Sequence, residues 1–174
     1  MDYHSTESIK LMNVQSKQSL KLLRSTYLAK EIVIIDLNDK RLGECSKYLD
    51  AKALKPNNKN ILNHHFDIVF DTVGMEATRN QAIEKIKPGG TIVHIGLTQP
   101  SGPFDFRKTT LQEITFIGTY CYTNKDFEKT LAILADQKIG SLKWIEYRKL
   151  QDGSSAFKDI HDGSCTSPKI ILLI

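Results

Sequence analysis

The sequence contains few cysteines, and these lie far apart. Only Cys45, Cys121 and Cys165 occur among its 174 residues. An odd number at such distances excludes a disulfide framework, for which an even set at short spacing is typical. A zinc site needs clustered cysteine, histidine or carboxylate ligands, and no such pattern is present. We interpret the adjacent His64 and His65 as loop residues and His94 as a packed strand residue.

The sequence also lacks a long apolar run. A bilayer-spanning helix needs about 20 such residues, and every run in this chain is much shorter. The first ten residues, MDYHSTESIK, carry no hydrophobic secretory core. We therefore expect a cytoplasmic protein without a membrane partner.

No block of one charge is present. The 24 lysines and arginines are interleaved with 20 aspartates and glutamates, for a net charge of +4. Such mixing is typical of solvated helix faces and argues against a nucleic-acid partner. With 40% hydrophobic residues in 174, the chain is long enough for one globular core.

The most informative segment is Phe66–Leu97. Its two β-rich apolar runs, Phe66–Val73 and Thr91–Leu97, are typical of parallel strands covered on both faces. Between them Met75–Ile86 has apolar residues at helical spacing, and Lys87-Pro88-Gly89-Gly90 is expected to end that helix. A strand, helix and strand in this order predict half of a nucleotide-binding sheet, whose ligands lie at the carboxyl ends of the strands.

The flanking segments extend the α/β pattern. Glu31–Asp36 predicts a buried strand, and Asp39–Leu54 predicts the helix after it. Residues 8–15 and 18–23 also have helical spacing. The other expected elements are a loop over 55–65 with at most one helical turn, a loop over 98–110 with a short helical end, a strand within 111–122, a helix over 150–162 and a strand over 169–174. An amphipathic helix over 124–138, capped by Thr123 or Asn124, is expected to turn Phe127, Leu131, Ile133 and Leu134 inward.

Asp36 ends the first of these strands. A carboxylate there can accept hydrogen bonds from both hydroxyls of an adenosine ribose, and it repels a 2'-phosphate, so NAD is favoured over NADP. Arg41 could stack on or bond the adenosine end. Alternatively, Asp36 caps the next helix and Arg41 is a solvated charge.

Glycines follow two of the predicted strands. At Gly74 and at Ile95-Gly96-Leu97 the backbone can approach a flat ligand, although tight turns alone explain glycines as well. Thr119 and Tyr120 end a third strand at the same edge, which favours a shared cleft.

Several segments together resemble a known family. EIVIIDLNDKRL, FDIVFDTVG, KIKPGGTIVHIGL, ITFIGTY with NKDFEKTLAILADQKI, and LQDGSSAFKDIHDG with KIILLI follow the order and spacing of the zinc-type medium-chain alcohol and polyol dehydrogenases. The resemblance covers residues 8–174 and is closest to the sorbitol, threonine and sugar-alcohol-phosphate branch. It implies a Rossmann-type doubly wound parallel sheet and NAD as cofactor. The implied cofactor-binding residues are Asp36, Arg41, Val73, Gly74, Ile95, Gly96, Leu97, Thr119 and Tyr120.

Two family features are missing. No Gly-x-Gly-x-x-Gly turn is present: SIKLMNVQ resembles the helix that follows this turn, with Lys10 at the third glycine and MDYHSTE in place of the first strand. The sheet is therefore expected to be incomplete. Its gap is closed by direct pairing of its neighbours, by an N-terminal run or by a partner, or else the domain is only marginally stable. The zinc-binding catalytic domain of the family has no counterpart, so zinc has no ligands and no residue is assigned as catalytic. We divide the chain into a non-family segment 1–7, a cofactor domain 8–149 and a C-terminal return segment 150–174.

Three functions remain open. The chain is a truncated dehydrogenase domain that binds NAD(H) weakly or no longer, a non-catalytic module that pairs with itself or with a full-length dehydrogenase subunit, or a degenerate gene product. The family reaction is the NAD-linked oxidation of a secondary alcohol, and the substrate is not encoded here.

Overall fold

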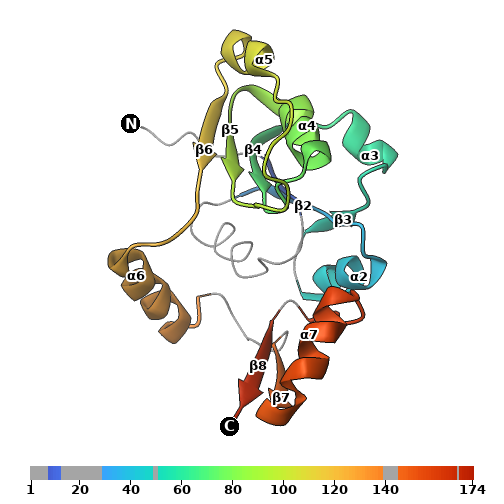
Figure 1. The fold of residues 1–174 in the computed structure, drawn as a ribbon. Coiled ribbons are helices and arrows are strands. Elements are labelled where there is room, and N and C mark those ends of the chain that lie inside the picture. Colours follow the sequence, from blue (N-terminus) through green and yellow to red (C-terminus); the bar gives the residue numbers. More distant parts are fainter. Residues whose placement is uncertain (1–7, 13–28, 49–50, 139–144, 168) are drawn as a thin grey trace.

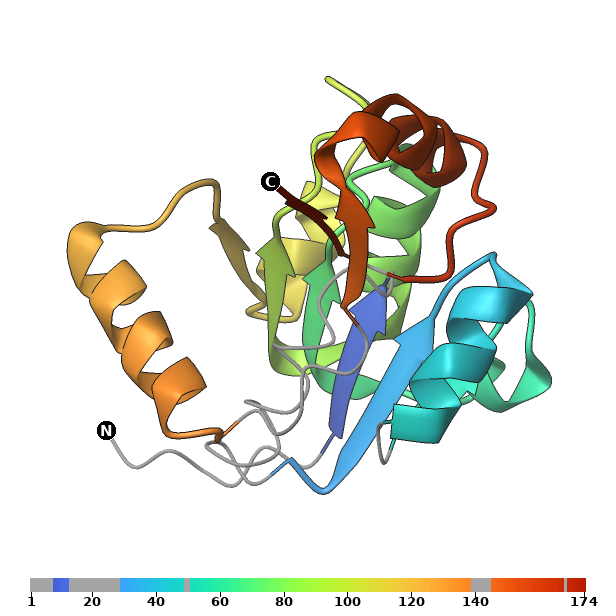
Figure 2. The ribbon, with the colours of Figure 1, turned by 90° about the horizontal axis from the view of Figure 1, so that it is seen from below.

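A parallel six-stranded sheet forms the centre of the molecule. The computed structural model describes residues 8–12, 29–48, 51–138, 145–167 and 169–174. The strand order is β3-β2-β1-β4-β5-β6, and each neighbouring pair is parallel (Figures 1 and 2). The strands are β1 Ser8–Met12, β2 Glu31–Ile35, β3 Lys52–Leu54, β4 Phe66–Asp71, β5 Ile86–His94 and β6 Thr115–Gly118. This order is that of a Rossmann-type sheet, which confirms the predicted fold class.

The central strand comes from the N-terminal run. β1 pairs with β2 from Ser8 opposite Glu31 onward, and with β4 from Ile9 opposite Ile68 onward. The helical interpretation of SIKLMNVQ is therefore wrong for residues 8–12, and Lys10 lies within a strand. Periodicity over so short a run does not separate a helix from a strand. The unpaired backbone groups of two buried neighbours explain why a strand forms here. The rest of that motif lies outside the described residues.

Helices cover both faces of the sheet, as expected for alternating side-chain directions in buried parallel strands. On one face, α3 Lys59–Leu62 and α4 Glu76–Lys85 lie over the core residues Val33, Ile35, Ile61, Phe66, Val69, Ala82, Ile83, Ile86, Ile92 and Ile114. On the other, α2 Asp39–Tyr48 packs with Ala29, Ile32, Ile34, Leu42 and Cys45. The one-turn α3 confirms the expected turn within residues 55–65.

Two predicted boundaries are wrong, and one strand was not predicted. The helix from Asp39 ends at Tyr48 rather than Leu54, and residues 52–54 pair with β2 as β3. Ala53 is half-buried beside the core that α2 covers. Its position in the sequence therefore matched the apolar spacing of a longer helix. The segment Lys87–Gly90 is part of β5 rather than a turn, because Ile86 already pairs with Phe66 before an irregularity in the register. Glu146–Lys149, which was not predicted, is β7.

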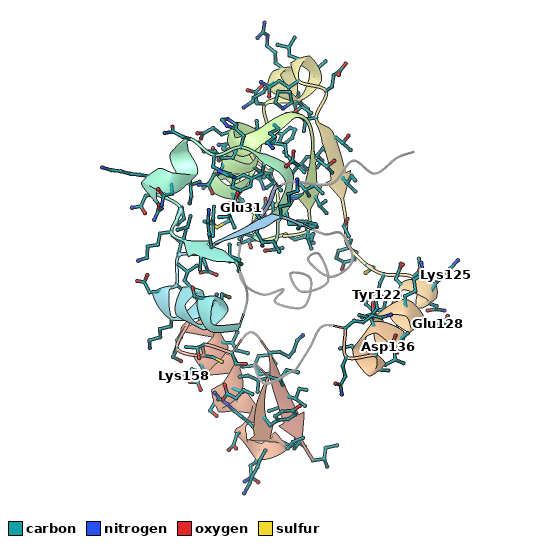
Figure 3. The ribbon with its side chains drawn as sticks, turned by 180° about the vertical axis from the view of Figure 1, so that it is seen from behind. Glu31, Tyr122, Lys125, Glu128, Asp136 and Lys158 are labelled. Atoms are coloured by element: carbon teal, nitrogen blue, oxygen red, sulfur yellow. The ribbon has the colours of Figure 1, made fainter. Side chains whose placement is uncertain are left out.

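The helix α6 Asn124–Ala135 lies apart from the sheet (Figures 1 and 2). Thr123 caps it as predicted, since its hydroxyl accepts a hydrogen bond from the Asp126 N–H at 3.2 Å. The predicted inward stripe is wrong for Phe127 and Leu131, which are 54% and 57% exposed, whereas Ile133 and Leu134 are half-buried. No α6 residue is fully buried. No described element covers this helix, and its labelled side chains project outward in Figure 3.

The C-terminal residues form a small unit beside α2. The short helix Leu150–Asp152 leads into α7 Gly153–His161, and β7 pairs in parallel with β8 Ile170–Leu173. This confirms the predicted terminal helix and strand. The Asn38 amide donates to the Gly163 carbonyl at 3.2 Å and joins the unit to the turn before α2. The helix α5 Phe106–Leu111 ends the loop after β5, also as predicted. None of the described helices has the length and apolar character needed to cross a bilayer.

Candidate functional site

The carboxyl ends of β4, β5 and β6 are joined by backbone hydrogen bonds. The Asp71 carbonyl accepts from the N–H groups of Ile95 and Gly96 at 2.8 and 3.0 Å. Two more hydrogen bonds join the β4 and β5 ends, from the Thr98 N–H to the Val73 carbonyl at 3.2 Å and from the Gln99 N–H to the Gly74 carbonyl at 3.1 Å. The Thr119 N–H donates to the His94 carbonyl at 2.9 Å. This places the predicted site residues Val73, Gly74, Ile95, Gly96, Leu97 and Thr119 along one edge.

Asp71 organises this edge from within. Its side chain is fully buried, and one carboxylate oxygen accepts from the N–H groups of Val73 and Gly74 at 3.1 and 2.9 Å. The other oxygen lies 3.2 Å from Nδ1 of His94. A hydrogen bond in which this carboxylate oxygen is the acceptor needs a proton on Nδ1. Asp71 therefore fixes both the turn after β4 and the orientation of the His94 ring.

The two site glycines are explained by packing against each other. Gly74 has a φ of +74°, which favours glycine. A β-carbon on Gly74 would overlap the carbonyl group of Gly96, and one on Gly96 would overlap that of Val73. The close approach of two strand ends therefore requires glycine at both positions, whether or not a ligand lies above them.

Asp36 lies at the same edge, with β1 between its strand and β4. The residue is 8% exposed, and its carboxylate accepts from the Asn38 N–H at 2.8 Å. The side chain of Asn38, not Asp36, caps α2, because its oxygen accepts from the N–H groups of Lys40 and Arg41 at 3.0 and 3.2 Å. Arg41 is half-buried in the first turn of that helix. Asp36 thus closes a turn, and helix capping does not account for it.

Tyr120, another predicted site residue, is highly exposed. It follows β6 with 82% of its surface exposed. Ile95 is 37% and Leu97 69% exposed at the same edge. Asp36 and Arg41 lie on the far side of β1 from these residues.

Sequence reasoning missed three residues of this edge. Asp71 lies inside the apolar run Phe66–Val73, His94 is predicted only as a packed strand residue, and Arg79 carries no signal of its own in the sequence. Arg79 is 9% exposed and clamps the edge, since its guanidinium donates to the carbonyls of Gly74 and Ser101 at 2.9 and 3.0 Å. The available signal is an aspartate at the end of an apolar strand, three residues before Gly74 and opposite His94 of the neighbouring strand.

Zinc does not fit this site. Within the described ranges no three histidine, cysteine or acidic side chains are grouped closely enough to hold a metal. Cys45 and Cys165 are buried as free thiols, Cys121 is exposed, and His64 stacks on Phe66 with ring centroids 4.7 Å apart.

A dinucleotide fits the site only in part. In a Rossmann-type sheet the turn after the central strand carries the glycines that approach the pyrophosphate. Here β1 ends at Met12, and the sequence that follows contains no glycine before Gly43. Asp36 stands where a ribose acceptor is expected, but glycine for a close backbone approach is missing from the sequence.

Comparison with known proteins gives a consistent result. A sequence model of the zinc-binding dehydrogenase family matches residues 20–136, more than half of the chain. The D-xylulose reductase of Saccharomyces cerevisiae is 28% identical over 107 residues, which cover 61% of this chain and 30% of that protein. The probable D-xylulose reductase A of Neosartorya fischeri is 24% identical over 148 residues, which cover 78% and 41%. The chain thus spans less than half the length of these curated relatives.

Solved structures share the fold. The alcohol dehydrogenase from Thermus sp. ATN1 superimposes with a TM-score of 0.85 at 20% identity, over 98% of this chain and 52% of that one. The acetophenone reductase from Geotrichum candidum in complex with NAD gives a TM-score of 0.82 at 18% identity, over 98% and 49%. The described architecture is therefore that of about half of each enzyme.

Proposed function

Because the chain belongs to the zinc-binding dehydrogenase family, we propose that it is the NAD(H)-binding part of an alcohol or polyol dehydrogenase and holds the cofactor weakly, through the adenosine end. The single observation that supports this is Asp36, a nearly buried carboxylate at the carboxyl end of β2. One of its oxygens is occupied by the Asn38 N–H. A carboxylate in this place suits the two hydroxyls of a ribose and disfavours a 2'-phosphate.

Weak binding follows from the lack of glycine in the sequence after β1. The pyrophosphate of a dinucleotide is normally held by backbone N–H groups that approach through glycine. Without glycine after β1, the free energy of binding rests on the adenosine and on the edge formed by Gly74, Gly96 and Thr119. We propose that the chain is not catalytic alone, since the described residues hold no zinc ligand cluster. The family reaction, NAD-linked oxidation of a secondary alcohol, would need a zinc-binding half.

Isothermal titration tests this proposal. NADH is expected to release heat at millimolar concentration and NADPH to bind more weakly. Asp36→Asn keeps an acceptor for the Asn38 N–H but removes the charge, and should weaken NADH about tenfold, since a hydrogen bond to a charged group contributes about 1.5–3 kcal/mol. Asp39→Asn is the matched control, because this exposed residue pairs with Lys55 instead. Absence of any heat with NADH would overturn the proposal.

A second function is favoured by the exposure of β6. All four residues of this edge strand are exposed, with Phe116 at 40% and Ile117 at 44%, and β5 is its sole partner among the described strands. An unpaired edge of this kind is a template for another strand. We propose, as the alternative, a module that associates through β6 with a second copy or a full-length relative. Light scattering after size exclusion would show a monomer at all concentrations if this alternative is wrong.

A further inference from the structure

A groove opens on the α4 face of the sheet, at the end of the molecule where α4, α5, β5 and β6 lie together (Figure 1). Its volume is about 600 Å³. Arg79 of α4, His94 of β5 and Phe116 of β6 line it, together with Phe104, Phe106 and Thr109 from the loop and α5. It adjoins the proposed cofactor edge, since Leu97 lines it, Arg79 donates to the Gly74 carbonyl and His94 contacts Asp71.

Aromatic side chains form one continuous wall of the groove. Phe104 meets Phe106 and Phe116 edge to face, with ring centroids 5.0 and 4.9 Å apart. The His94 ring follows at 5.7 Å from Phe116. Phe106 is 73% exposed, so the wall remains open to a ligand. Rings in such arrays favour a further ring at an offset or edge-to-face position.

Arg79 gives the groove a buried positive charge. The side chain donates to two backbone carbonyls, Gly74 and Ser101, but these are neutral. In the part of the chain that the structure describes, no carboxylate lies within ion-pair distance of it, and no acidic residue lines the groove. A buried charge is normally paired, because its removal from water is unfavourable. The guanidinium has five N–H donors, and two carbonyls do not use them all.

These features select an anion with a flat apolar body. We propose that the groove binds an aromatic monocarboxylate, with the carboxylate at Arg79 and the ring against Phe104, Phe106 and Phe116. The fork geometry of a guanidinium matches a carboxylate. The proposal is independent of cofactor binding, so it holds for a protein that binds no NAD.

Titration of the full chain with benzoate tests the charge requirement. Benzamide has the same shape without the charge, and acetate has the charge without the ring. Benzoate is expected to bind at least about tenfold more tightly than benzamide, and acetate should not saturate. Equal binding of benzoate and benzamide would overturn the proposal. So would formation of a dimer that covers the groove and prevents benzoate from binding.

Two phenylalanines of equal exposure provide a matched pair of variants. Phe106→Ala removes part of the wall and should weaken benzoate several-fold. Phe157→Ala, on α7 and 75% exposed, lies outside the groove and should leave benzoate binding unchanged. The proposal fails if both variants weaken benzoate equally.

Replacement of the cation separates charge from shape. Arg79→Met should abolish the preference for benzoate over benzamide. Since Arg79 also holds the loop at Ser101, retained benzamide binding in this variant verifies that the groove is intact. If Arg79→Met binds neither ligand, two other measurements test the proposal: benzoate binding by Phe106→Ala, and the ratio of benzoate to benzamide affinity in the wild type. Asp36→Asn should bind benzoate as the wild type does, which separates this site from the cofactor edge.

Discussion

The backbones of Gly74 and Gly96 lie so close that neither residue has room for a β-carbon. A methyl group on either would overlap a carbonyl group of the opposite strand end. Because the hydrogen bonds between the two segments depend on this approach, the geometry of the whole edge depends on two missing side chains.

Alanine at these glycines should therefore destabilise the protein strongly. We expect Gly96→Ala to lower the free energy of unfolding by about 3 kcal/mol or more, in the range of severe backbone and packing conflicts. Gly43→Ala is the control, since a β-carbon there meets nothing within 4 Å in an exposed part of α2, and it should add about 0.5–1 kcal/mol. Urea unfolding measures both. A Gly96→Ala variant as stable as the wild type would contradict the close approach.

The buried carboxylate of Asp71 gives the second prediction. Asp71→Ala leaves the N–H groups of Val73 and Gly74 without their acceptor, at about 1–3 kcal/mol for each buried group. Asp71→Asn retains one acceptor oxygen and should cost less. Denaturant titration ranks the variants, and an Ala variant as stable as the Asn variant would contradict this role.

The buried strands of the sheet were predictable because their signal is strong. Glu31–Ile35 and Phe66–Asp71 are nearly unbroken apolar runs, and parallel strands covered on both faces need such runs. β1 and β3 were missed because five and three residues are too few to show a period. β7 was missed because Glu146–Lys149 is mostly charged, and its charges are paired locally, as Arg148 bonds Glu146 and Asp159 at 2.6 and 2.7 Å.

The site was predictable only as positions along an edge. Parallel strands bring Gly74, Gly96 and Thr119 together whatever their side chains are. The bonds of Asp71 to His94 and of Arg79 to two carbonyls depend on side-chain directions in three dimensions. Local sequence carries no information on such contacts between distant residues.

Acid should remove the contribution of Glu31 to stability. The hydrogen bond from the Lys52 ammonium at 2.6 Å, with the nearby His64, holds the pKa of Glu31 below its ordinary value of 4.5. Because the folded-state pKa is depressed, this contribution is complete above about pH 5 and is lost as the pH falls through the folded-state value. The difference in unfolding free energy between wild type and Glu31→Gln should shrink in that direction. Glu128→Gln, on the exposed α6 (Figure 3), is the control; a pH-independent difference for Glu31 would contradict the ion pair.

The three thiols should differ in reactivity. Burial raises the pKa of the Cys165 thiol, and the Glu146 carboxylate at 3.5 Å acts in the same direction. Cys45 is buried, whereas Cys121 is exposed. At about pH 8, a disulfide reagent should modify one thiol quickly, and peptide mass analysis should place it at Cys121. Fast modification of Cys45 or Cys165 in the folded protein would contradict the described burial.

The side chain of Asn38 should couple α2 to the C-terminal unit. Asn38→Asp keeps the cap of α2 but cannot donate to the Gly163 carbonyl. Asn38→Ala loses both and should cost about 1 kcal/mol for the cap alone. Hydrogen exchange should show faster exchange in α7 for both variants, and in the first turn of α2 for Asn38→Ala only. Unchanged exchange in α7 would contradict the coupling.

The position of β1 sets an order of events for folding. β1 lies in the middle of the sheet and precedes both of its neighbours in the sequence, since β2 and β4 begin at Glu31 and Phe66. Pairings so distant in sequence require closure of long loops, which slows folding. Because β4 is farther from β1 in the sequence than β2 is, the edge of β1 that faces β4 is expected to pair last.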